Sequence, residues 1–160
     1  MFFRSEFPEH RAVGSGSDQR AVPLQVSFDG FFKRSERGKP RFDLRLRDAQ
    51  VDGSLFDVDV DEKYLGWKLP AFSLQPLMDN AVKHNSITRR NPFHISVHTE
   101  GDRLVVSNPK VPKLEPEPST GIGLENLRNR WHLITGRSIE IDDNGRTFTV
   151  RMPLQNPTAG

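Results

Sequence analysis

The feature that most constrains the fold of this 160-residue chain is the hydrophobic periodicity after residue 54. Apolar side chains recur there either at every second position, as in strands, or at the spacing of a helix face. The segments follow in the order strand, helix, strand, strand, loop, helix, strand, strand. This order predicts an α+β domain in which helices cover one face of a mixed sheet.

Several short apolar segments are predicted to be strands, and all but residues 104–106 alternate apolar with polar residues. They are residues 55–60, 93–97, 104–106, 139–141 and 147–152. The last two are predicted to form a hairpin through Asp143-Asn144-Gly145, because asparagine followed by glycine favours a tight turn. Upstream of these strands, residues 42–51 are predicted to form a short helix.

The first long helix is predicted from a buried stripe with i, i+3, i+4, i+7 and i+8 spacing. Its members are Leu74, Leu77, Met78, Ala81 and Val82. Two starts are compatible with the sequence. Either Pro70 lies in the first turn, or Ser73 is the N-cap and Pro76 lies within that turn.

Three polar residues, Asn80, Lys83 and His84, share one face of this helix, because they lie at i, i+3 and i+4. An asparagine carbonyl is a hard oxygen ligand for Mg²⁺, which binds a few protein oxygens together with waters and phosphates. A lysine one turn later adds a cation for the same phosphates. The alternative is an ordinary solvated helix face with an Asp79–Lys83 ion pair worth about 0.3–0.5 kcal/mol.

The stretch Ser119-Thr120-Gly121-Ile122-Gly123-Leu124 leads into a second helix, predicted over residues 121–134 and ended by Gly136. Glycines at a helix entrance let backbone N–H groups approach a phosphate, and the positive end of the helix dipole favours the anion. The stretch is not a Walker loop, because no Gly-Lys-Ser/Thr follows, and it lacks the third glycine of a dinucleotide fingerprint. The alternative is an ordinary N-cap by Ser119 or Thr120.

Composition excludes several classes of function. The 23 Lys+Arg against 21 Asp+Glu leave a net charge of +2, which demands neither a nucleic acid nor an anionic membrane as partner. Cysteine is absent, which excludes a disulfide framework, a thiolate zinc site and a thiol nucleophile. No apolar run approaches the roughly 18–20 residues that span a bilayer. We therefore expect a cytoplasmic domain that binds no nucleic acid.

Taken together, the two polar stretches resemble the nucleotide-binding boxes of sensor histidine kinases. Residues 69–85 (LPAFSLQPLMDNAVKHN) resemble the N box and are most similar to that of the LytS/YehU-like subfamily. Residues 119–130 (STGIGLENLRNR) resemble its G2 box, and residues 145–153 resemble its closing hairpin. The resemblance implies the Bergerat (GHKL) fold, a two-layer α/β sandwich with helices on one face of a mixed sheet and ATP held under a lid.

The resemblance also implies ATP and Mg²⁺ as cofactors and assigns the site residues. Asn80 would hold Mg²⁺, and Lys83 would meet the phosphates with His84 beside it. The phosphate cradle would be formed by Ser119, Thr120, Gly121, Ile122, Gly123 and Leu124. Asn108 stands where an aspartate usually accepts the adenine amino proton, and Thr147 would support adenine recognition. Residues 109–118 would be the ATP lid, from which Lys110 and Lys113 would reach a phosphate.

These residues lead us to interpret the chain as the catalytic ATP-binding domain of a sensor histidine kinase, which transfers the γ-phosphoryl group to a histidine on a separate dimerisation domain. Gyrase-like members carry a water-activating glutamate four residues before the Mg²⁺ asparagine. Pro76 stands at that place here, which favours a kinase over autonomous hydrolysis. Two alternatives stay open: a non-catalytic nucleotide-binding regulatory module, suggested by Asn108-Pro109-Lys110 in place of Asp-x-Gly-x-Gly, and an anti-sigma-factor-type serine kinase.

The implied partners are a phosphoacceptor histidine domain, expected outside this chain, and a response regulator. We also expect a homodimer in the full-length protein and a parent protein anchored in the bacterial inner membrane. The ATP-binding domain is predicted over residues 41–155, between an N-terminal extension or linker (1–40) and a tail (156–160). Six of the 11 phenylalanines fall by position 32, and we expect these rings to dock on the domain or on a partner.

Overall fold

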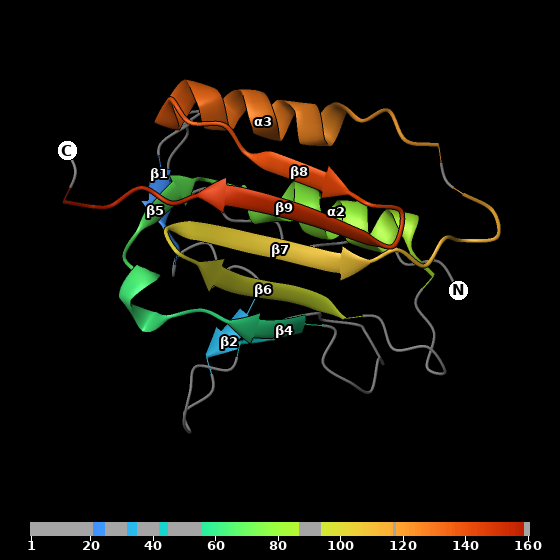
Figure 1. Cartoon of the computed structure of the whole chain (residues 1–160), viewed down its shortest axis with the longest axis horizontal. Helices are drawn as coiled ribbons and strands as arrows, with labels where there is room; N and C mark the ends of the chain where they lie inside the picture. Colours follow the sequence, from blue (N-terminus) through green and yellow to red (C-terminus); the bar gives the residue numbers. More distant parts are fainter. Residues whose placement is uncertain are drawn as a thin grey trace.

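The computed structural model describes residues 21–24, 32–34, 42–44, 56–86, 94–116 and 118–158. Its main layer is a five-stranded sheet with the order β4-β6-β7-β9-β8 (Figure 1). In this order the strands are Phe56–Asp59, Ile95–Glu100, Arg103–Pro109, Thr147–Pro153 and Glu140–Asp143. β4 pairs in parallel with β6, and the other neighbours are antiparallel, so the sheet is mixed.

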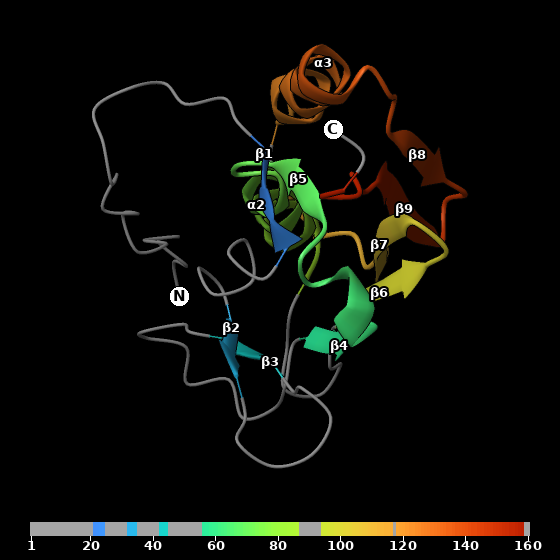
Figure 2. The same cartoon turned by 90° about the vertical axis from the view of Figure 1, so that its left-hand side faces the viewer.

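Two helices, α2 (Leu74–His84) and α3 (Ile122–Thr135), form the second layer. Figure 2 shows both helices on the same side of the sheet. The predicted two-layer α/β sandwich with helices on one face is confirmed. In the part of the chain that the structure describes, no helix is long and apolar enough to cross a bilayer.

The core lies between these layers and follows the predicted helix stripes. Leu74, Leu77, Met78 and Ala81 of α2 are each at most 4 % exposed; the side chain of Val82, the fifth member of that stripe, lies outside the described part. From α3, Leu127 and Trp131 are fully buried, while Leu124 and Ile134 are half-buried. The apolar surface buried between the two layers stabilises their packing by about 25 cal/mol per Å².

A second, two-stranded sheet was not predicted. β1 (Ala21–Pro23) pairs antiparallel with β5 (Lys68–Pro70), and a short 3-10 helix, η1 (Glu62–Tyr64), precedes β5. The next residue, Leu24, donates its N–H to the Trp67 carbonyl at 2.7 Å, and its side chain is fully buried in the core. Residues 21–24 of the N-terminal region therefore pack against the domain.

The predicted helix over residues 42–51 is wrong where it can be compared. Phe42–Leu44 form strand β3, which pairs antiparallel with β2 (Phe32–Arg34); residues 45–51 lie outside the described residues. Cross-strand pairing satisfies the backbone groups of this short segment, and such non-local pairing overrides local propensity. The side chain of Phe32, the five earlier phenylalanines and the Gly14–Ser17 stretch also lie outside the described part.

The helix starts resolve the two alternatives at α2 and correct the prediction at α3. α2 begins at Leu74 with Ser73 as N-cap, so Pro70 belongs to β5. The Ser73 hydroxyl donates to the Pro70 carbonyl and makes no capping bond. α3 has Gly121, not Ser119 or Thr120, as N-cap, because the backbone there is left-handed (φ 69°) and glycine adopts that conformation without steric cost.

Candidate functional site

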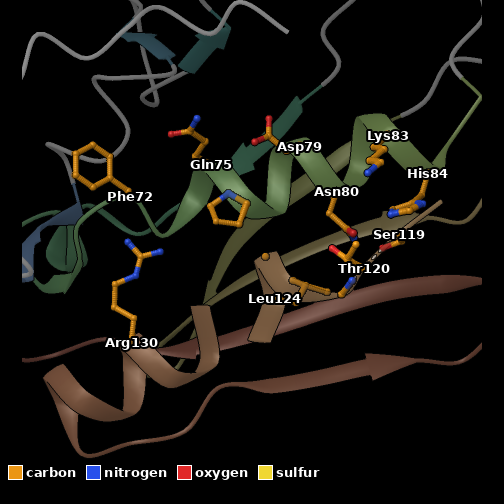
Figure 3. Close-up of a pocket in the computed structure, with 13 residues that line it drawn as sticks. Phe72, Gln75, Asp79, Asn80, Lys83, His84, Ser119, Thr120, Leu124 and Arg130 are labelled. Carbon is orange, nitrogen blue, oxygen red and sulfur yellow. Dashed lines mark hydrogen bonds between the residues drawn. The ribbon is translucent and has the colours of Figure 1, made fainter. Parts of the chain in front are cut away.

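A cavity of about 410 Å³ opens between α2 and the N-terminal end of α3. Asn80, Lys83 and His84 line it from α2. The opposite wall consists of residues from the glycine-rich stretch, namely Ser119, Thr120, Gly121, Gly123 and Leu124. Figure 3 shows the Asn80 and His84 side chains directed toward Ser119 and Thr120. The structure thus brings together the two stretches that lie about 35 residues apart in the sequence.

A second cavity, of about 350 Å³, shares Asn80, His84 and Leu124 with the first. Its remaining walls come from the end of α2, the start of the proline-rich loop and the β8–β9 hairpin: Asn85, Asn108, Lys110, Pro112, Asp143 and Phe148. The first cavity is lined by glycine backbone, hydroxyls, Lys83 and Arg130, together with Phe72 and Asp79. The second has the Phe148 ring beside the buried Asn108 amide, together with Lys110 and Asp143. The two therefore suit different parts of one ligand, an anionic part and a flat heteroaromatic part.

The N-terminal end of α3 supplies donors to the first cavity. The first N–H groups of an α-helix have no partner within the helix, and the helix dipole gives this end a partial positive charge. A Cβ added to Gly123 would meet nothing within 4 Å, so the space beside its backbone is open. Backbone amides at this end can therefore approach an anion closely, with Lys83 on the facing wall.

Asn108 lies in β7 and lines the second cavity, although only 6 % of its surface is exposed. Its Nδ2 donates to the Pro109 carbonyl at 2.9 Å. This bond fixes the orientation of the amide and leaves Oδ1 as the atom that can accept a proton from a ligand.

Ile122 and Thr147, both predicted to bind ATP, line neither cavity. Ile122 is 55 % exposed, because the first turn of α3 turns its side chain toward solvent. Thr147 is half-buried at the start of β9, where its N–H donates to the Asn144 side chain at 2.8 Å. Of the two loop lysines expected to reach a phosphate, Lys110 lines the second cavity and Lys113 lines neither. The remaining residues that the sequence assigns to the site border one or both cavities.

The alternative of an Asp79–Lys83 ion pair is not realised among the described residues. Asp79 Oδ1 is buried there without a hydrogen-bond partner, and burial raises the pKa of this carboxyl above its ordinary value of 3.8. Figure 3 shows Asp79 and Asn80 leaving α2 in different directions. Lys83 is exposed and borders the first cavity.

Several residues of the site were missed by sequence reasoning. Arg130 reaches from α3 toward the start of α2, where one guanidinium nitrogen donates to the Ala71 carbonyl at 2.9 Å and burial lowers its pKa (Figure 3). Its spacing of seven residues from Gly123, two helical turns, is the signal that would have found it. Phe72, also on the cavity wall, has a left-handed backbone (φ 60°), which is uncommon for a residue other than glycine.

Lys110, predicted to reach a phosphate, is held elsewhere in this structure. Its Nζ lies 2.9 Å from both carboxylate oxygens of Asp143, and its N–H donates to the Arg146 carbonyl at 2.8 Å. The hydrogen bond from Lys110 lowers the pKa of Asp143. Because Asp143 lies in the β8–β9 hairpin, no sequence pattern near residue 110 indicates this pair.

Sequence comparison finds relatives among the sensor histidine kinases. The chain is 26 % identical, over 167 aligned residues, to the sensor histidine kinase/phosphatase LytS of Staphylococcus aureus strain MRSA252 and to LytS of strain N315. Each match covers 91 % of this chain and 27 % of the relative. The chain thus spans little more than a quarter of the length of the curated relatives it matches. No family model matches it.

Structural comparison finds the Acinetobacter baumannii histidine kinase AdeS, with a TM-score of 0.41 and 16 % identity, over 64 % of this chain and 55 % of that one. It also finds the catalytic domain of the histidine kinase ThkA, with a TM-score of 0.39 and 19 % identity, over 62 % of this chain and 79 % of that one. Identification rests on the sequence relatives and on the arrangement of helices and strands. The chain is a homologue of the LytS-type sensor histidine kinases, and its fold is a two-layer α/β sandwich with helices on one face of a mixed sheet.

Proposed function

We propose that this chain is the catalytic ATP-binding domain of a sensor histidine kinase. In this proposal it binds ATP with Mg²⁺ and transfers the γ-phosphoryl group to a histidine on a separate dimerisation domain. The observation that carries the proposal is the first cavity. Its two walls are the Asn80–Lys83 face of α2 and the glycine-rich entrance to α3. Homology to LytS supports the same activity.

The residues around the first cavity fit a metal-bound polyphosphate. Asn80 offers an amide oxygen, the kind of hard ligand that Mg²⁺ accepts alongside phosphate oxygens and water. Lys83 and the N-terminal amides of α3 neutralise and hold the phosphates from either side. A bound Mg²⁺ supplies charge neutralisation on the transferred group. The chain itself contributes positioning, which is the larger part of catalysis in phosphoryl transfer.

The second cavity fits the base. Asn108 Oδ1 accepts a hydrogen bond from the adenine amino group, because Nδ2 is already bonded to the Pro109 carbonyl. Guanine presents a carbonyl at the same place, which would face another acceptor. Phe148 provides an aromatic surface on the same cavity wall. Asn108, which stands where an aspartate is usual, therefore keeps the acceptor that adenine needs, although without the charge of an aspartate.

Pro76, four residues before Asn80, also lines the first cavity. Its ring has no basic atom with which to activate a water molecule, which favours transfer to a protein acceptor over hydrolysis. The proposed partners are a phosphoacceptor histidine domain and a response regulator. We further propose that the domain works in the cytoplasm as part of a dimeric parent protein anchored in the bacterial inner membrane.

The proposal is tested by titrating the chain with a fluorescent ATP analogue, with and without Mg²⁺, and then by adding radiolabelled ATP and a separate phosphoacceptor domain. We expect Mg²⁺-dependent binding and a phosphorylated acceptor domain. The phosphoryl group should be acid-labile, because phosphohistidine is acid-labile. Binding without transfer would instead identify a regulatory module. An acid-stable product on a serine-bearing antagonist would identify a serine kinase, and absence of binding would overturn all three functions.

A further inference from the structure

The end of α2 holds the start of the proline-rich loop through one side chain. Asn85, the C-cap of α2, is only 5 % exposed and uses both ends of its amide. Nδ2 donates to the Ala81 carbonyl at 2.8 Å, and Oδ1 accepts the Val111 N–H at 2.7 Å. The first bond caps the helix, whereas the second crosses 26 residues of sequence and is not needed for capping.

Backbone contacts continue this attachment on either side. The Ser86 N–H donates to the Val111 carbonyl at 2.8 Å, and Asn85 forms an isolated antiparallel bridge with Pro112. Lys110 is tied at the same time to the β8–β9 hairpin through Arg146. Residues 110–112 are therefore held from two directions. Residues 114–116, just beyond them, are exposed.

We propose that Asn85 is a positioning residue that fastens the base of the proline-rich loop to the helix carrying Asn80 and His84. Asn85 and Pro112 line the second cavity together with those two residues. The Asn85–Val111 bond therefore sets the spacing between α2 and the loop on the side of the cavity assigned to the base. The inference rests on the proposed function only in its consequence for nucleotide binding, since the attachment itself exists without a ligand.

A matched pair of substitutions separates loop attachment from helix capping. Asn85→Asp keeps an oxygen for the Val111 N–H but loses the donor to the Ala81 carbonyl, and its charge is unfavourable at a helix C-terminus. Asn85→Leu, of similar size, loses both bonds. If Asn85 serves only as a cap, the two variants behave alike. If it fastens the loop, only the leucine variant releases residues 110–112.

The measurement is the rate of tryptic cleavage after Lys113 in the nucleotide-free 160-residue chain. Digestion is carried out under native conditions, and the fragments are identified by mass spectrometry. A protease needs an extended segment around the cleaved bond, so cleavage requires residues 110–112 to leave α2, and its rate follows the open population. We expect cleavage about fivefold faster in Asn85→Leu, the effect of losing one buried hydrogen bond. Asn85→Asp is expected to stay within about twofold of the parent chain, even where its melting temperature falls further.

Equal acceleration in both variants, in step with their melting temperatures, would overturn the proposal, as would an unchanged rate in Asn85→Leu. Should the leucine variant not fold, hydrogen exchange on the parent chain decides. The Val111 N–H is expected to exchange at least about tenfold more slowly than that of the exposed Leu114, and equal exchange would refute the attachment. Because no nucleotide is present, these results stand apart from the ATP titration, which alone decides the proposed function.

Discussion

Asn80 places an amide oxygen on the wall of the first cavity, one turn from the ammonium group of Lys83. Asp79, the neighbour of Asn80, carries a buried carboxylate oxygen without a partner among the described residues. These two adjacent residues of α2 therefore differ in what their side chains do. The Asn80 side chain faces the first cavity, while burial of the Asp79 carboxylate carries a desolvation cost that no described contact offsets.

Replacing Asn80 by alanine is expected to remove the Mg²⁺ dependence of nucleotide binding and to weaken binding at least tenfold, because the metal loses its protein oxygen. Asn80→Asp is the matched control, since it retains an oxygen ligand of the same length. Both are measured by titration with an ATP analogue, with and without Mg²⁺. Unchanged affinity in the alanine variant would remove Asn80 from the site.

Asp79→Asn is expected to raise the melting temperature at pH 7 by a few degrees. Burial raises the pKa of Asp79, so the folded chain holds this proton more tightly than the unfolded chain. The stability of the parent chain therefore falls as pH rises from 3.8 through the folded pKa. The advantage of the asparagine variant should disappear below that window. Thermal unfolding of both proteins across pH checks this, and a pH-independent difference would contradict it.

At the scale of elements, hydrophobic periodicity predicted the long helices and strands correctly but did not predict the short strands. α2, α3 and the strands of the main sheet were predicted because each repeats its pattern over several positions. β1 and β5 have three residues each, and they pair across more than 40 positions of sequence, so no local window contains the signal. The same limit explains the wrong helix at residues 42–51, where Phe42–Leu44 pairs with β2.

The candidate site divides in the same way. Asn80, Lys83, His84 and the glycine-rich stretch were predicted because their spacing puts them on a helix face or at a helix entrance, and because both stretches resemble nucleotide-binding boxes. Arg130 and Asp143 were missed, since their places depend on how α3 packs beside Ala71 and how the β8–β9 hairpin meets the loop. Local spacing therefore predicts site residues that lie together on one helix or at its entrance. Residues such as Arg130 and Asp143 are brought to the site only by tertiary packing.

The entrance to α3 offers a test of its role as an element. Gly123→Val should reduce affinity for an ATP analogue at least tenfold, because its two methyl groups would fill open space beside the N-terminal amides. Gly123→Ala, with one carbon, should have a smaller effect on binding and should stabilise the helix by up to about 1 kcal/mol. Titration and thermal unfolding measure both. Equal affinity in all three proteins would mean that the phosphates lie elsewhere.

At the scale of the whole molecule, β5 links distant parts of the chain. β1 pairs with one edge of β5, and on the other Lys68 and Gln155 exchange two backbone hydrogen bonds of 2.8 Å. β5 then leads through Ser73 into α2, which carries Asn80. Segments near both ends of the described chain are thus joined to the element that precedes the candidate site (Figure 2).

Leu24→Ala tests whether this arrangement supports the fold. The side chain of Leu24 is fully buried in the core, so its truncation should cost about 2–4 kcal/mol of the free energy of unfolding. Leu114→Ala is the matched control, because Leu114 is fully exposed in the proline-rich loop and should change stability by less than about 0.5 kcal/mol. Urea unfolding compares them. Equal effects would show that β1 is not docked in solution.

The burial of Leu24 bears on where the protein can be shortened. A chain trimmed to residues 41–155 would lack both this leucine and β1. Its interior would contain a hole the size of one aliphatic side chain, and the outer edge of β5 would present bare peptide groups to other molecules, an arrangement that promotes self-association. Preparations intended for crystallisation or ligand screening should therefore begin upstream of Ala21.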